Sequence, residues 1–62
     1  MEYDMICIFT PQGSTFLFHD VKILCENERI LQFSYKAMSD GRTKLAIFPK
    51  QQLSGWSVTP KS

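Results

Sequence analysis

Hydrophobic and polar residues alternate along most of the chain, in short segments that are separated by turn residues. The segments are rich in Ile, Val, Phe, Tyr and Thr, which are typical of β-strands, and no stretch shows the spacing of an amphipathic helix. Turn residues lie at positions 11–14, 26–28 and 39–41. The pattern predicts an all-β domain with five or six strands between residues 3 and 58.

The second segment contains a change of phase. Phe16 and Phe18 have even numbers, whereas Val21 and Ile23 have odd ones, and residues 19–20 interrupt the alternation. Because a shift by one residue moves every side chain to the other face, we expect a bulge or bend here. Such a bend allows one long strand to curl around a core.

The segment 39–41 is the clearest hairpin signal in the sequence. A two-residue loop would place Phe33 opposite Phe48. A three-residue loop, with Gly41 in the left-handed conformation, places Phe33 opposite Ile47 and gives one continuous apolar face. We therefore expect the three-residue loop.

An odd-length reversal around Asn27 would extend the same apolar face to the preceding segment. The predicted core is therefore Val21, Ile23, Leu31, Phe33, Tyr35, Leu45 and Ile47. Residues of the first segment, with Trp56 and Val58, are expected to close it.

After the strand 44–48, residues 49–53 have the length of a single helical turn, and a short strand follows around Trp56. Two meandering hairpins, one 3-10 turn and a short closing strand resemble the layout of small SH3-like barrels. The resemblance implies a five- to six-stranded SH3-like barrel or a strongly bent meander, with the 3-10 turn near residues 49–53. The same order of elements is also compatible with an OB-like barrel or an open sheet.

The composition fits one small globular domain, because 44% of the 62 residues are hydrophobic and 21% are charged. We expect the domain to span residues 1–59 and residues 60–62 to form a flexible tail. The sequence shows no secretory signal and no run of about 20 apolar residues, so we expect a cytoplasmic protein without a membrane segment. Cys7 and Cys25 stand among apolar residues, as buried thiols do.

The residues available for catalysis are few. His19 is the only histidine, and no nucleophile, base and orienting group are recognisable by spacing. The two cysteines are isolated, so the sequence contains no metal-ligand spacing, and the three glycines are scattered rather than gathered in a phosphate-binding loop. We therefore expect a protein that is not an enzyme and that has no cofactor and no metal.

Charge is distributed unevenly. Residues 1–28 carry five acidic residues and one basic residue, whereas residues 29–62 carry six basic residues and one acidic residue. In the expected register the face opposite the core places Lys36 across from Lys44, an arrangement that needs an acidic side chain or an anion between them. A basic strand surface beside an aromatic ring is also suited to single-stranded nucleic acid. The residues predicted for this alternative function are Lys22, Lys36, Arg42, Lys44 and Phe48.

The leading hypothesis is a non-catalytic interaction module. The first segment is apolar on both faces, so its strand needs two neighbours, and one of them could come from a second copy. The opposite face of the sheet also carries apolar residues that should be covered. The predicted interface consists of Tyr3, Met5, Leu24, Ile30 and Phe48. Its expected partner is a second copy, as a dimer or higher oligomer, or another protein.

Overall fold

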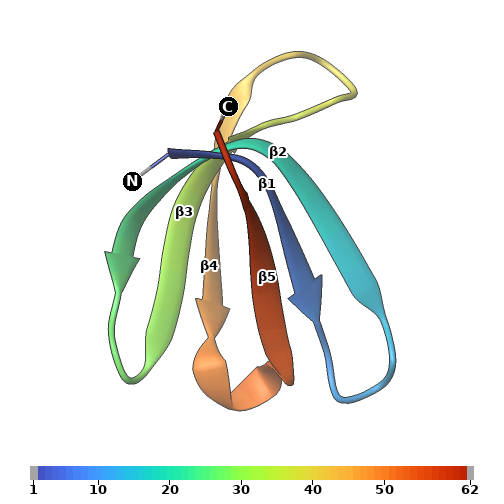
Figure 1. Cartoon of the computed structure of the whole chain (residues 1–62), viewed down its shortest axis with the longest axis vertical. Helices are drawn as coiled ribbons and strands as arrows, with labels where there is room; N and C mark the ends of the chain where they lie inside the picture. Colours follow the sequence, from blue (N-terminus) through green and yellow to red (C-terminus); the bar gives the residue numbers. More distant parts are fainter. Residues whose placement is uncertain (1, 62) are drawn as a thin grey trace.

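The computed structural model describes residues 2–61, which form one strongly bent antiparallel sheet (Figure 1). The strand order is β4-β3-β2-β1-β5, and the sheet is not closed. The fold class predicted from the sequence is confirmed: the domain is all-β, with one 3-10 turn inside the expected range 49–53. The elements are β1 (Glu2–Phe9), β2 (Thr15–Glu26), β3 (Ile30–Lys36), β4 (Thr43–Pro49), η1 (Lys50–Gln52) and β5 (Gly55–Pro60).

The last strand extends one residue beyond the predicted domain. Pro60, which was expected in the flexible tail, is the last residue of β5. Met1 of the predicted domain and Ser62 of the predicted tail lie outside the described residues.

The predicted bend lies in the middle of β2. Asp20 has a φ of 52°, and it is the only residue other than glycine with a positive φ in the described part of the chain. On either side of it, Phe18 pairs with Ile6 and Val21 pairs with Tyr3, and all four side chains contribute to the core. The bend therefore keeps both halves of β2 facing inward although their numbering changes from even to odd.

β2 belongs to both halves of the structure. Its first half pairs with β1, which also pairs with β5, and its second half pairs with β3, which also pairs with β4. In Figure 1 the strand crosses the upper end of the molecule and descends on the other side. The core lies between these two halves of one sheet.

Aromatic side chains fill the space between the halves. Phe33 is fully buried, and its ring stacks on Phe48 with a centroid distance of 6.0 Å. Phe18, from the other half of the sheet, makes edge contacts with Phe33 at 5.2 Å and with Tyr35 at 4.7 Å. The fully buried residues around them are aliphatic: Ile6, Ile8, Val21 and Leu31.

The loop around Asn27 differs from the prediction. The Asn27 N–H donates to the Ile30 carbonyl at 3.1 Å, which leaves a two-residue loop, so the predicted odd length is wrong. A bulge in β2 between Ile23 and Cys25 adds one residue and restores the phase. Ile23 still pairs with Phe33, and the predicted core face of β2 and β3 forms by this different route.

The β3–β4 hairpin also differs from the prediction. The Ala37 N–H donates to the Arg42 carbonyl at 2.8 Å, which leaves a four-residue loop instead of three. Gly41 has the expected left-handed conformation, with a φ of 70°. The additional loop residue moves Phe33 opposite Ala46.

This one-residue shift exchanges the two faces of β4. Ala46 and Phe48 pack against the core, whereas Leu45 and Ile47 lie on the outer face with 63% and 59% of their surface exposed. The prediction that Leu45 and Ile47 belong to the core is wrong. Its cause is that β4 is apolar on both faces, so the sequence pattern alone did not select one.

The first strand has both of its neighbours within the chain. β1 pairs with β2 on one side and with β5 on the other, so the second neighbour that its sequence requires is not a second copy. Its inner face carries the buried Ile6 and Ile8.

We expect Asp20→Val to lower the free energy of unfolding by about 1–2 kcal/mol, because a β-branched side chain is strained at a positive φ. Asp20→Gly is the matched control and should be at least as stable as the parent chain. Urea denaturation followed by circular dichroism measures both. A valine variant as stable as the glycine variant would contradict the bend described here.

Candidate interaction surface

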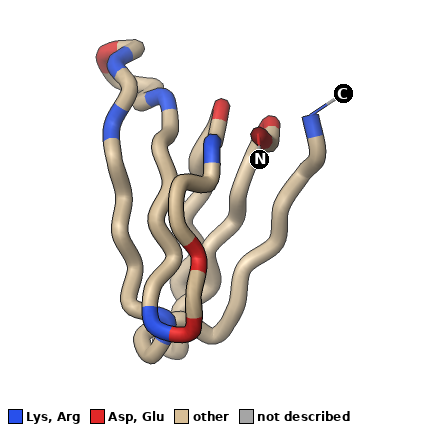
Figure 2. The backbone as a smooth tube through the Cα atoms, turned by 90° about the vertical axis from the view of Figure 1, so that its left-hand side faces the viewer, with Lys and Arg blue, Asp and Glu red and all other residues tan. Residues whose placement is uncertain are grey.

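The sheet has two edge strands, β4 and β5, which lie on opposite sides of the molecule (Figure 2). In this view β4 descends from the β3–β4 loop along the outer left side, and no other strand lies beyond it. Edge strands present unpaired backbone N–H and C=O groups, which can accept a further strand. The two edges are therefore candidate binding sites of the sheet.

The hydrogen bonds at the two ends of the β3–β4 ladder show which backbone groups of β4 are unpaired. Arg42 accepts from the Ala37 N–H, and the Lys50 N–H donates to the Arg29 carbonyl at 2.8 Å. Because bonded and non-bonded positions alternate in an antiparallel pair, the even-numbered residues of β4 bond to β3. The N–H and C=O groups of Thr43, Leu45 and Ile47 point away from the sheet.

The side chains of these odd-numbered residues lie on the outer face. Leu45 pairs with Ser34 and Ile47 pairs with Gln32, so their neighbours in the sheet are polar. Both are more than half exposed. β4 thus combines unpaired backbone groups with two uncovered apolar side chains on the same residues.

Edge strands of natural proteins are commonly protected against pairing with another chain by bulges, charged side chains or proline, but β4 has little of this protection. Its ladder with β3 has no register shift, whereas the β1–β5 and β2–β3 ladders each have at least one. Lys44 is the only charged residue of the strand, and its side chain is directed to the inner face, where it forms an ion pair with Asp40 at 3.6 Å. Pro49 ends the strand.

The β5 edge is different. The Thr10 N–H donates to the Ser14 carbonyl at 3.0 Å, so these two residues form a bonded pair at the end of the β1–β2 ladder. Because bonded positions alternate along a strand, the even-numbered residues of β1 bond to β2 and the odd-numbered ones bond to β5. On β5, Trp56 and Val58 therefore direct their N–H groups outward, while their side chains face the core side with Ile8 and Ile6. The outer face of β5 carries Gly55, Ser57 and Thr59, none of which has a large apolar side chain, and Pro60 ends the strand.

The residues predicted as an interface do not form one surface. Tyr3 and Leu24 line a groove between the second half of β2 and β5, together with Trp56 and Val58. Phe48 packs in the aromatic core. The remaining two lie on the outer side of the sheet on different strands: Met5 pairs with His19, and Ile30 pairs with Pro49.

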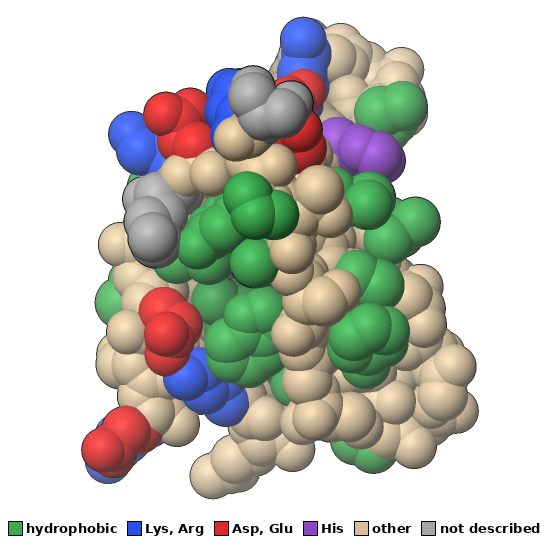
Figure 3. Space-filling model, viewed as in Figure 1, with side chains coloured by type: hydrophobic (Ala, Val, Ile, Leu, Met, Phe, Trp, Pro, Cys, Tyr) green, Lys and Arg blue, Asp and Glu red, His purple; other side chains and the backbone are tan. Residues whose placement is uncertain are grey.

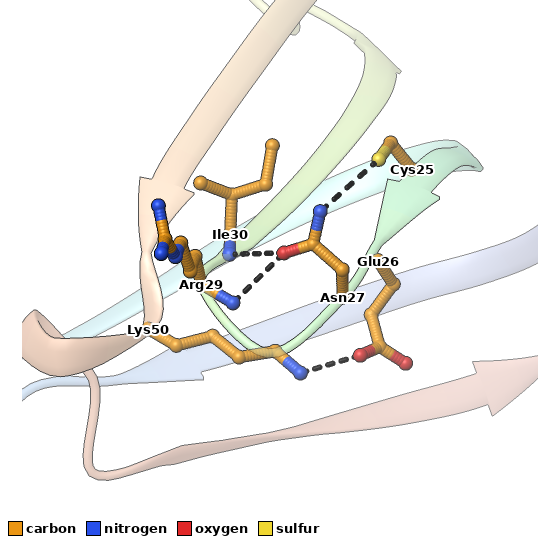
Figure 4. Close-up of polar contacts among 6 residues, drawn as sticks. All are labelled: Cys25, Glu26, Asn27, Arg29, Ile30 and Lys50. Carbon is orange, nitrogen blue, oxygen red and sulfur yellow. Dashed lines mark hydrogen bonds and ion pairs between the residues drawn. The ribbon is translucent and has the colours of Figure 1, made fainter.

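A charged contact lies at one end of this groove (Figure 4). Lys50 of η1 pairs with Glu26 at the end of β2, and its ammonium lies 5.2 Å from the centre of the Trp56 ring. Asn27 fixes the adjacent loop, because its Oδ1 accepts the N–H groups of Arg29 and Ile30 at 2.8 and 3.0 Å. The contact joins η1 to the β2–β3 hairpin, and the ammonium over Trp56 also brings η1 against β5.

Figure 3 shows the face that carries β1 and β5. Hydrophobic side chains gather in its middle, and charged ones lie at its upper end and at its lower left. The outer face of β4 is directed away from this view.

The residues predicted to bind nucleic acid are also separated. Lys22 and Lys36 lie on the outer face, where Lys22 pairs with Ser34 and Lys36 with Thr43. Lys44 pairs with Tyr35 on the inner side, so the predicted opposition of Lys36 and Lys44 is wrong.

The last two residues of that set lie elsewhere. Arg42 is in the loop that precedes β4, and Phe48 stacks on Phe33 with an angle of 15° between the rings. Phe48 therefore has one face occupied within the protein, and it does not lie beside the outward-facing lysines.

An uncharged hollow of about 570 Å³ lies between the β1–β2 loop and η1. Phe16, Phe48 and Leu53 provide its apolar part, and the glutamines Gln12, Gln51 and Gln52 lie on its rim. No charged side chain lines it.

His19, Cys7 and Cys25 are dispersed. His19 pairs with Met5 and Lys36, and both cysteines are half-buried and free. Among residues 2–61 no group of three or more His, Cys, Asp and Glu side chains is arranged to hold a metal ion. In the same part of the chain, no helix has the length and hydrophobicity needed to cross a membrane.

Comparison of the chain with protein-family models, with curated proteins and with solved structures found no match.

We expect the amide protons of Thr43, Leu45 and Ile47 to exchange with solvent faster than those of Lys44, Ala46 and Phe48, which bond to β3. Hydrogen exchange followed by NMR in dilute solution measures both sets within one strand. Equal protection of the two sets in dilute solution would contradict the free edge.

Proposed function

We propose that this chain is a non-catalytic interaction module that associates with itself through the exposed edge of β4. The observation that carries the proposal is that Leu45 and Ile47 present unpaired backbone groups and uncovered apolar side chains together. A further strand pairs with the first and places its own side chains beside the second, which buries them in part. The proposal retains the self-association expected from the sequence but assigns it to β4 instead of β1.

The small size of the domain favours such association. A domain of about 60 residues buries only about 60% of the surface that its unfolded chain exposes, which limits the stability of its core. Here the fully buried side chains are one phenylalanine and four aliphatic residues. Placing apolar side chains of a second copy beside Leu45 and Ile47 would add apolar burial that the single chain lacks.

The charge of the chain is compatible with self-association. The net charge is only +1, so two copies do not repel each other strongly. On β4 itself the Lys44–Asp40 ion pair reduces the local positive charge.

We expect the sedimentation-equilibrium mass to rise above the 7.2 kDa of a single chain as its concentration increases from micromolar to millimolar. Small interfaces are weak, so the rise should fall within this range. A constant mass of one chain over the whole range would refute the proposed function.

Ile47→Lys should weaken the association at least about tenfold, because it places a charge in the contact and removes apolar burial from both copies. Folding should change by no more than about 0.5 kcal/mol, since Ile47 is exposed in the single chain. Leu17→Lys is the matched control, because Leu17 is 57% exposed on the outer face of β2. If the Leu17 variant dissociates and the Ile47 variant does not, the surface lies elsewhere.

A further inference from the structure

The unpaired groups of β4 define the kind of partner and its orientation. We infer that β4 pairs antiparallel with β4 of a second copy, about a two-fold axis that passes beside Ala46. This inference rests on the proposed function and adds to it the strand that binds, its direction and its register.

Two copies of β4 fit each other because the same residues carry the free groups and the outer-face side chains. In an antiparallel ladder the side chains of two bonded residues lie on the same face. Pairing Leu45 with Ile47 of the second copy therefore places outer face beside outer face. The two sheets become one continuous sheet without a change of side.

A head-to-tail arrangement of β4 with β5 fits less well. On β5 the outward N–H groups belong to Trp56 and Val58, whose side chains face the core. Antiparallel pairing would then put the outer face of one copy beside the inner face of the other. Parallel pairing avoids this conflict, but only Trp56 and Val58 could donate, because Pro60 has no N–H.

The apolar side chains select the register within the β4 pair. With Ala46 across from Ala46 of the second copy, Leu45 of each chain lies beside Ile47 of the other. Apolar side chains that lie directly across from each other on paired strands stabilise a sheet. Moving the register to place Leu45 across from its own counterpart would leave Ile47 beside Thr43.

Charge is compatible with this register. Lys44 lies across from Phe48 of the second copy and not across from Lys44, so like charges are not opposed. Thr43, Leu45 and Ile47 of each chain each have an acceptor on the partner strand. One hydrogen bond is missing at each end of the paired strands, because Pro49 has no N–H to donate to Thr43 of the second copy.

The two-fold arrangement is closed. Each copy uses its β4 edge once, and the outer ends of the combined sheet are two β5 strands with polar outer faces. An isologous contact of this kind gives dimers, whereas a head-to-tail contact gives rings or filaments. The inferred assembly is therefore a dimer at all concentrations at which it forms.

The register can be tested by isotope-filtered NMR on a mixture of labelled and unlabelled chains at a concentration at which association is observed. In non-bonded antiparallel pairs the Cα atoms are about 4.5 Å apart and their hydrogens point at each other. We expect an intermolecular cross-peak between the Hα atoms of Lys44 and Phe48, and one between the two Ala46 residues. An intermolecular contact from Lys44 to Ala46, or from Val58 to β4, would overturn the inferred register.

Chemical synthesis of the 62-residue chain allows a second test that leaves every side chain in place. N-methylation of Ile47 removes an outward N–H and should weaken the dimer at least about tenfold, because each of the two symmetric copies loses one hydrogen bond. N-methylation of Val58 is the matched control, since that N–H points away from the sheet at the β5 edge. It should leave dimerisation unchanged.

The outcomes separate the inference from the proposed function. A chain that remains a monomer at every concentration refutes both. A chain that associates, but with equal sensitivity to the two methylations or with a mass above that of a dimer, refutes the β4 pairing and leaves self-association in place.

Discussion

The contact between Phe18 and Phe33 connects the two halves of the sheet. Phe18 lies before the bend of β2 and Phe33 lies on β3, and their ring centres are 5.2 Å apart. The hydrogen bonds between the strands do not by themselves hold the two halves of the bent sheet against each other. Apolar side chains packed between the halves are needed for that. Phe48 and Tyr35 extend this contact toward β4, so the position of the edge strand also depends on it.

The alternation of the sequence was sufficient to predict the strands, the bend and the 3-10 turn. Phe18 and Val21 have opposite parity and no turn residue of the Pro or Gly type between them, so a change of phase within one strand was the natural interpretation. The core of β2 and β3 was also predicted correctly, although a bulge and an even loop replace the odd loop that was expected. The loop is one residue shorter than expected and the bulge adds one residue, so the two changes cancel in their effect on which face each side chain occupies. A sequence pattern of period two cannot distinguish this arrangement from an odd loop without a bulge.

The face of β4 could not be predicted in the same way. Leu45 and Ile47 on one side and Ala46 and Phe48 on the other are both apolar, so either choice gives a hydrophobic inner face. The decision depends on whether the loop before β4 has three or four residues, and both lengths are compatible with a left-handed Gly41. The predicted binding surfaces depended on the length of this loop. Phe48 was therefore expected on the outer face of the sheet, whereas it packs against the core. The signal that could have identified β4 is that both of its faces are apolar, a property that was interpreted as a binding signal only for the first strand.

The first and last described residues, Glu2 and Lys61, lie close together. The ion pair of 3.7 Å between Glu2 and Lys61 joins the start of β1 to the residue after β5. Both strands belong to the half of the sheet that lies opposite β4 (Figure 2). Any additional polypeptide fused to either end would therefore emerge from the β1–β5 side. Such a fusion would leave the β4 edge accessible, and two fused partners on a dimer would be carried on its outer flanks.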